Sequence, residues 1–177
     1  MDSREVSLIA MFSALWTVLD YVFAPIFWSL THLPFLCDAI TLTMIVLTIW
    51  AVRRFGSAAL VAIITFILHM MLRPGYWFAS WIATAFIMDA LAAAYGYKRT
   101  FNMSLGSMVF IVVSFMVSAF VGGFLIGMTM FTTIEGYLTW GVYHSFGGFL
   151  ASLVSISIIK GLEMRGIRPI IEEGESA

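Results

Sequence analysis

The sequence predicts an all-α integral membrane protein, a bundle of six transmembrane helices with both termini in the cytoplasm. Of its 177 residues, 62% are hydrophobic and 11% are charged, whereas a soluble domain carries about 25% charged residues. The mean hydropathy is +1.01. Six spans of about 20 residues with short loops use nearly the whole length. We therefore expect a single six-helix transmembrane domain over residues 1–177.

Polar, glycine-bearing and proline-bearing stretches divide the apolar sequence into six segments. We expect helices over residues 6–23, 35–52, 57–72, 76–95, 104–130 and 137–159, a loop over 24–34, and a charged cytoplasmic tail over 164–177. No small-residue cleavage site stands out before Pro25, so the first segment is expected to be retained rather than removed as a signal peptide. A re-entrant segment is the main alternative to six full spans.

The basic residues test the number of spans and predict the orientation. In a six-span arrangement Arg73 falls on one side of the membrane and the other basic residues fall on the opposite side. An excess of Lys and Arg marks the cytoplasmic side, so both termini are expected there, in the cell membrane. The residues on this side are Arg4, Arg53, Arg54, Lys98, Arg99, Lys160, Arg165 and Arg168.

Acidic, histidine and aromatic side chains gather in the opposite, outer half of the predicted bundle. Ionisable residues at membrane depth are costly and usually face the bundle interior or a cavity. Aromatic walls with a few polar groups are typical of ligand sites, so the pattern predicts a cavity open to the outside. The candidate substrate-binding residues are Asp20, Trp28, His32, Asp38, His69, Arg73, Trp77, Trp81, Glu135, Trp140, Tyr143 and His144.

Each candidate also has a simpler interpretation. Any single Trp or Tyr could belong to the aromatic belt at the membrane surface, and Asp38 could cap its helix. Asp89 stands apart in the inner half of the fourth segment, where a structural hydrogen bond between helices is expected. Glycines such as Gly123 and Gly147 are expected to let helices pack closely.

Several kinds of chemistry have no motif in this chain. It lacks H-E-x-x-H, a P-loop and G-x-G-x-x-G. Its single cysteine, Cys37, excludes an internal disulfide and a multi-cysteine metal site, and the net charge of −1 gives no electrostatic case for nucleic acid. We therefore expect no cofactor, no metal and no catalytic activity of its own.

The chain resembles the S component, the substrate-binding membrane subunit, of an energy-coupling factor (ECF) vitamin transporter. The resemblance covers nearly the whole length and rests on the small size, the six predicted helices and the order and spacing of short motifs. These motifs are Arg4–Leu15 with its Ala10-x-x-x-Ala14 pattern, Arg54–Gly56, Ile87–Leu91 and Gly147–Ala151.

The resemblance implies a function as the capture subunit of an ABC importer. Such a subunit takes a vitamin from outside, docks on a transmembrane coupling subunit through Ala10 and Ala14, and releases its substrate inward as two ATPase subunits drive the cycle. The loop carrying Phe27, Trp28 and His32 would close over the substrate. Aromatic walls with nearby acids favour a flat, cationic or hydrogen-bonding heterocycle such as thiamine or its pyrimidine precursor. Arg73 leaves an anionic ligand open.

Two alternatives remain at this point. The first is a membrane-embedded enzyme that uses Asp, Glu and His side chains. Ser145-Phe146-Gly147 beside His144 only weakly resembles the serine–histidine pair of an intramembrane protease. The second is a structural membrane subunit without a ligand.

Overall fold

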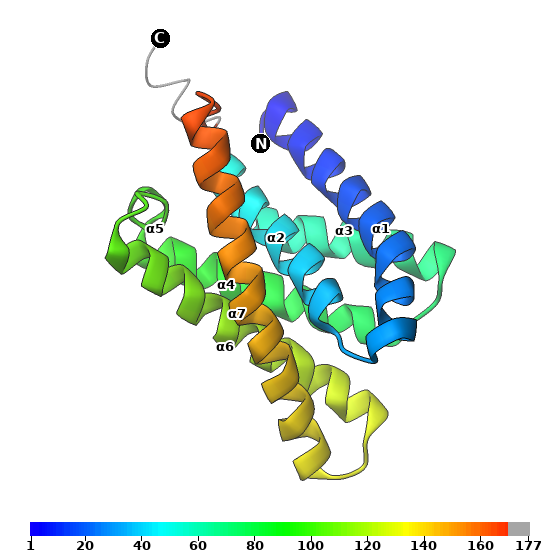
Figure 1. Ribbon diagram of the computed structural model, residues 1–177. Helices are drawn as coiled ribbons and strands as arrows, with labels where there is room; N and C mark the ends of the chain where they lie inside the picture. Colours follow the sequence, from blue (N-terminus) through cyan, green and yellow to red (C-terminus); the bar gives the residue numbers. More distant parts are fainter. Residues whose placement is uncertain (170–177) are drawn as a thin grey trace.

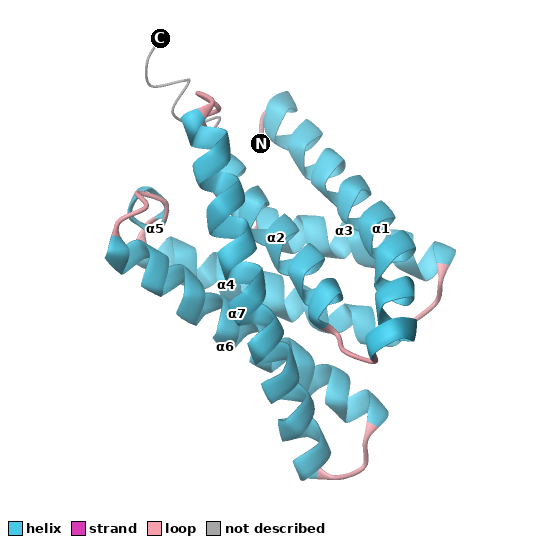
Figure 2. Cartoon of the chain, in the orientation of Figure 1, coloured by secondary structure: helices cyan, strands magenta, loops and turns pink. Residues whose placement is uncertain are grey.

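The computed structural model describes residues 1–169, and every regular element in this range is helical (Figures 1 and 2). The predicted cytoplasmic tail lies outside the described residues from residue 170 onward. The elements in chain order are α1 (Ser3–Thr31), α2 (Phe35–Val52), α3 (Ser57–Leu72), the 3-10 helix η1 (Tyr76–Ala79), α4 (Ser80–Tyr95), α5 (Tyr97–Thr100), α6 (Leu105–Met130) and α7 (Ile134–Met164).

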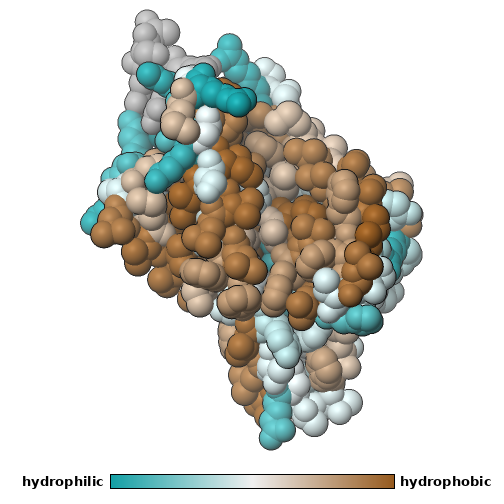
Figure 3. Space-filling model, viewed as in Figure 1, coloured by the Kyte–Doolittle hydropathy of each residue, from teal (hydrophilic) through white to brown (hydrophobic). Residues whose placement is uncertain are grey.

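Five helical segments are long and apolar enough to cross a membrane: α1, α2, η1 with α4, α6 and α7. Their length and composition indicate a multi-pass membrane protein. The apolar helix α3 has 16 residues, which at 1.5 Å per residue gives about 24 Å, short of the roughly 30 Å hydrocarbon core. Figure 3 shows apolar side chains over the middle of one face and hydrophilic ones at its upper end.

The expected loop over residues 24–34 is wrong, because α1 continues through Pro25 to Thr31. A proline commonly ends a helix, since it lacks a backbone N–H. In a membrane helix, however, an interior proline is tolerated because its surroundings satisfy the freed backbone groups. The chain turns only at His32, whose left-handed backbone (φ 55°) caps α1 while its N–H donates to the Trp28 carbonyl at 2.8 Å.

Helix α7 also exceeds its expected range of 137–159 at both ends. It begins at Ile134, where the Thr133 hydroxyl accepts a hydrogen bond from the Gly136 N–H at 3.3 Å. With α6 it forms a long antiparallel hairpin that extends below the other helices in Figure 1. Gly148 permits close contact, because a Cβ there would lie 2.8 Å from the Phe115 carbonyl oxygen and 2.9 Å from the Ala119 Cβ.

Helix α2 is the most enclosed of the candidate spans, with residues 41–52 all buried. It packs against α1 and α7. The Thr43 and Ser155 hydroxyls join α2 to α7 with a buried hydrogen bond of 3.0 Å. Hydroxyl pairs of this kind are one way in which membrane helices associate.

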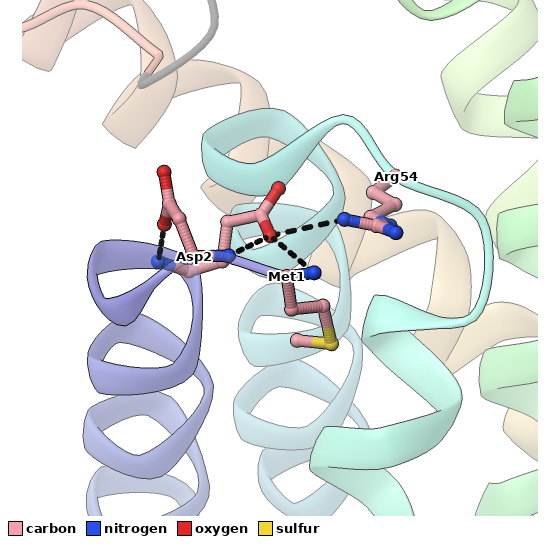
Figure 4. Close-up of polar contacts among 4 residues, drawn as sticks. Met1, Asp2 and Arg54 are labelled. Carbon is pink, nitrogen blue, oxygen red and sulfur yellow. Dashed lines mark hydrogen bonds and ion pairs between the residues drawn. The ribbon is translucent and has the colours of Figure 1, made fainter.

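The start of α1 and the end of α7 lie at the same end of the bundle, at the top of Figure 1. There the buried Glu5 accepts from the Arg54 guanidinium at 3.2 Å and pairs with the Met1 amino group at 3.7 Å (Figure 4). The Trp50 indole donates to Glu163 at 3.2 Å. These contacts join the start of α1, the end of α2 and the end of α7. We call this end of the bundle, which carries Arg54, the basic end.

Asp89 makes the structural hydrogen bonds expected of it. Its Oδ2 accepts from the backbone N–H groups of Gly56 at 2.7 Å and Ala58 at 3.3 Å, and its Oδ1 accepts from the Tyr97 hydroxyl at 3.1 Å. The carboxylate thus satisfies free N–H groups at the start of α3, as an N-cap residue would. It joins α4 to the turn between α2 and α3.

Candidate ligand-binding site

A cavity of about 510 Å³ lies in the half of the bundle opposite the basic end. It is bounded by the second half of α1, the start of α2, the end of α3, η1, the start of α4, the end of α6 and the first half of α7. This volume falls within the range of about 300–1,000 Å³ found for small-molecule sites. The cavity is therefore large enough for a ligand of vitamin size.

Eight of the candidate binding residues lie together around this cavity, although they come from five elements. Most contribute aromatic rings or imidazoles, and Arg73 is an exposed cation among them. The eight are Asp20, Trp28, His69, Arg73, Trp77, Trp81, Trp140 and His144.

The other four candidates lie away from the cavity lining. Asp38 is fully buried and contacts His144 instead of capping α2. His32 is exposed at the end of α1, where its ring centroid lies 5.9 Å from that of Trp28. Glu135 is exposed in the first turn of α7, and Tyr143 is 44% exposed.

Asp20 and His69 form the first of two buried carboxylate–imidazole pairs. Asp20 is 3% exposed and His69 is 1% exposed, and Oδ2 lies 3.1 Å from Nε2. The other imidazole nitrogen, Nδ1, lies 3.0 Å from the Thr65 carbonyl oxygen. The Phe78 ring covers the imidazole, with 4.1 Å between the ring centroids. These contacts fix the His69 ring from three sides.

His144 and Asp38 form the second pair, joining α7 to α2 with 2.6 Å between Nδ1 and Oδ1. Glycines make room for both partners. A Cβ on Gly123 would lie 2.6 Å from Cδ2 of His144, and a Cβ on Gly147 would lie 2.7 Å from Cγ of Asp38. The two glycines therefore allow a polar pair to sit between closely packed helices.

Aromatic rings form much of the cavity wall. Trp140 meets Trp28 edge to face with 6.1 Å between centroids, and it meets His144 at 5.6 Å. Trp81 approaches His144 from another side, also at 5.6 Å. Edge-to-face contacts at such distances hold rings at fixed angles, so the wall can present flat apolar surfaces to a planar ligand.

Three polar atoms of cavity-lining side chains are buried and have no hydrogen-bond partner within residues 1–169. They are Asp20 Oδ1, His144 Nε2 and Trp140 Nε1. A buried polar atom without a partner costs about 1–3 kcal/mol. These atoms are therefore unsatisfied polar groups in the packing behind the cavity lining.

Eleven residues that the sequence pattern did not predict also line the cavity. Some had a signal: Cys37 adjoins Asp38, and Tyr76 and Phe78 flank Trp77. The end of α6 gave none, because its apolar residues look alike on every face. The missed residues are Tyr21, Ala24, Pro25, Leu33, Pro34, Cys37, Tyr76, Phe78, Ile126, Thr129 and Met130.

Comparisons with known proteins identify no relative. No protein-family model, no curated protein and no solved structure matches the chain. Across residues 1–169, no three His, Cys, Asp or Glu side chains come together as a metal site would require. The site is therefore interpreted from its own geometry.

Proposed function

We propose that this protein is the substrate-capture subunit of an ECF-type importer in the cell membrane. The observation that carries the proposal is the aromatic cavity with buried Asp20 and His144 on its wall, at the end of the bundle away from the basic loops. Basic loops face the cytoplasm in most membrane proteins, so the cavity would open outward. The termini would then be cytoplasmic, and the segment after Pro25 would cover the cavity as a helix rather than as a loop.

The partners in this proposal are a transmembrane coupling subunit and two ATPase subunits. Ala10 and Ala14 are exposed on α1, one turn apart. Small residues at this spacing let a second helix approach closely within a membrane. This supports α1 as the docking surface that the family resemblance implies.

The substrate we propose is a vitamin or related flat heterocycle, with thiamine or its pyrimidine precursor as the best candidate. Tryptophan rings favour planar and cationic groups by stacking and cation–π contact. Four of the six tryptophans in the chain line the cavity: Trp28, Trp77, Trp81 and Trp140.

The direct test is to identify what the protein carries. Protein purified in mild detergent is denatured, and the released small molecules are identified by mass spectrometry. We expect a vitamin-like heterocycle that raises the melting temperature when added back. Absence of any bound molecule, with no thermal shift from a vitamin panel, would contradict the proposal and favour a structural subunit.

The docking surface has its own test. Ala10→Trp and Ala14→Trp are expected to block cellular uptake while leaving ligand binding unchanged, because the bulky ring prevents close approach on α1. Ala93→Trp is the matched control, since Ala93 is an exposed alanine on α4. Normal uptake by both α1 variants would exclude this docking surface.

The two carboxylate–imidazole pairs are the observation that favours the alternative of an enzyme. A histidine oriented by a carboxylate is a common arrangement for general base catalysis. An enzyme would convert the bound molecule, so incubation of the purified protein with the recovered ligand would yield a product of different mass. A capture subunit would return the ligand unchanged.

A further inference from the structure

The cavity lining combines an exposed part, which we call the mouth, with buried polar groups. Asp20, His69 and His144 are at most 3% exposed, whereas the mouth carries aromatic rings and one charged side chain, that of Arg73. We infer that Arg73 binds an anionic group, a carboxylate or a phosphate, on a ligand whose planar part contacts these rings. The inference rests on the proposed capture function and assigns a charge to its substrate. The rings of the mouth are those of Tyr21, Trp28, Tyr76 and Trp77.

The charge that a ligand meets at the mouth is positive. All nine Lys and Arg residues lie in the described chain, and Arg73 alone among them lines the cavity. Within residues 1–169, the acid on the lining is Asp20, which is buried and directs Oδ2 to Nε2 of His69 at 3.1 Å. Charge complementarity therefore favours a ligand with a negative group over a simple cation.

The Arg73 guanidinium is available to a ligand. The side chain is exposed and has no ion-pair partner among residues 1–169. Its backbone is fixed, because the N–H donates to the His69 carbonyl at 2.7 Å at the end of α3. Guanidinium N–H groups form a planar fork that holds a carboxylate or phosphate by two parallel hydrogen bonds. Arg73 can thus fix the position of an anionic group and neutralise its charge.

An aromatic ring accompanies Arg73 on the same short turn. A Cβ on Gly75 would lie 2.5 Å from Cζ2 of Trp77, so the indole packs directly against the backbone of this turn. The ring nevertheless stays 43% exposed and lines the cavity, and Tyr76 beside it is 79% exposed. The segment 73–77 therefore offers flat apolar surface together with a guanidinium, which suits a planar ring that bears an acidic substituent.

A lipid phosphate is the other anion that an exposed arginine meets at the end of a membrane helix. Arginines at helix ends commonly reach the membrane interface, and that role needs no cavity. Arg73, however, lines a cavity of about 510 Å³ together with aromatic rings. Basic residues are also scarce on the non-cytoplasmic side, toward which we propose that the cavity opens. These observations favour an anion of the ligand over a headgroup.

Matched pairs of small molecules test the charge. Pyrimidine-5-carboxylate and pyrimidine-5-carboxamide share a ring and a shape but differ in charge, and thiamine monophosphate differs from thiamine by its phosphate. Each is titrated against the protein purified in an uncharged detergent, and the rise in melting temperature gives the affinity. We expect the anionic member of each pair to bind about tenfold more tightly, because it gains hydrogen bonds between charged groups.

Variants assign the contact to Arg73. Arg73→Met removes the charge but keeps an unbranched side chain, and it should abolish the preference for the anionic members. Arg73→Lys keeps the charge without the planar fork and should retain a preference of about threefold. Arg165→Met is the matched control, since Arg165 is also exposed, also follows the last residue of its helix and lies off the cavity lining. Because both arginines are exposed, these variants should melt at the wild-type temperature without ligand.

A short-chain lipid separates a headgroup from a ligand. Dihexanoylphosphatidylglycerol, added below its micelle concentration, supplies a lipid phosphate without a planar ring. If this lipid stabilises the wild type but not Arg73→Met, and neither pair shows a preference, Arg73 binds a headgroup and the inference is overturned.

The remaining outcomes separate the inference from the proposed function. Equal affinities within both pairs, or a preference that persists in Arg73→Met, overturn the inference. Recovery of a neutral or cationic heterocycle from the purified protein, with the same affinity for the wild type and Arg73→Met, also overturns it while leaving the capture function intact. If no molecule is recovered and no vitamin raises the melting temperature, the capture function fails and the inference fails with it.

Discussion

Replacing Gly147 with alanine tests how closely α7 approaches the buried carboxylate of Asp38. A Cβ at this position would lie 2.7 Å from Cγ and 2.9 Å from Cβ of Asp38, and it would overlap Oδ2. Real Cβ atoms essentially never come closer than 3.0 Å to such neighbours. Asp38 cannot yield freely, because His144 holds it at 2.6 Å. Either α7 moves away from α2 or the carboxylate leaves its imidazole.

The two responses bound the expected loss of stability. Overpacking a closely packed interior costs about 1–3 kcal/mol, and stranding one partner of a buried ion pair costs about 3–5 kcal/mol. A shift of the helix is the less costly response, so we expect a loss of about 1–3 kcal/mol. At roughly 2–4 °C per kcal/mol for a chain of this size, the melting temperature should fall by about 2–12 °C.

The assay is thermal unfolding of the wild type and two variants in the same detergent. Gly161→Ala is the matched control, because it lies on the same helix and a Cβ there meets no atom within 4 Å. Alanine is favoured over glycine inside a helix by about 0.5–1 kcal/mol, so the control should melt at or slightly above the wild-type temperature. If Gly147→Ala melts as high as Gly161→Ala, the close approach of α7 to Asp38 is refuted.

Three further predictions concern contacts outside the cavity. Asp89→Ala removes the acceptor for two N–H groups at the start of α3 and should destabilise the protein by about 1–3 kcal/mol, measured as a lower melting temperature. Burial and the Asp89 carboxylate raise the pKa of Tyr97. Because the folded state holds this proton more tightly than the unfolded state does, the hydroxyl contributes its full stabilisation below about pH 10 and progressively less above it. The difference in melting temperature between wild type and Tyr97→Phe should therefore shrink at alkaline pH. Thr43→Val breaks the buried hydrogen bond to Ser155 and should cost about 1 kcal/mol in thermal unfolding; no change in any of these measurements would contradict the corresponding contact.

The helices that the sequence predicted well are those with strong local end signals. Helices α2 and α3 have the expected bounds because Arg53 and Gly56 adopt left-handed backbone conformations in the turn between them, and glycine is well suited to such a position. The end of α1 was mispredicted because Pro25 carries the same local signal whether it ends a helix or lies inside one. What distinguishes the two cases is the membrane environment, which a window of sequence does not encode.

The location of the cavity could be predicted from the sequence, but which carboxylate contacts which histidine could not. Acids and histidines at membrane depth had to lie near a cavity or one another, which placed Asp20, His69 and His144 in one half of the bundle. Their partners depend on helix packing, since Asp20 is 49 residues from His69 and Asp38 is 106 residues from His144. The role of Gly147 is equally non-local, because only the packed bundle brings Asp38 against it.

The contrast between the two ends of the bundle supports a binding role for the cavity. At the basic end, Asp89 receives hydrogen bonds from two backbone N–H groups and a tyrosine hydroxyl, and Glu5 pairs with Arg54 and the Met1 amino group. The acids at the basic end therefore have several partners each. In the opposite half, Oδ1 of Asp20 and Oδ2 of Asp38 are buried without a hydrogen-bond partner in the described chain.

Pairing with an imidazole resolves what would otherwise be a conflict at Asp20. A lone carboxylate at membrane depth is costly, and a carboxylate whose oxygens all have hydrogen-bond partners has no free acceptor for a ligand. The contact with His69 gives Oδ2 of Asp20 a hydrogen-bonding partner inside the bundle, whereas Oδ1 has none in the described chain. Asp20→Leu removes this oxygen but also leaves Nε2 of the buried His69 without its partner, so it should lower thermal stability. If Asp20 also binds the ligand, the substitution should in addition abolish the thermal shift that the recovered ligand gives. A purely structural Asp20 would lose stability on this substitution and leave the thermal shift from the recovered ligand unchanged.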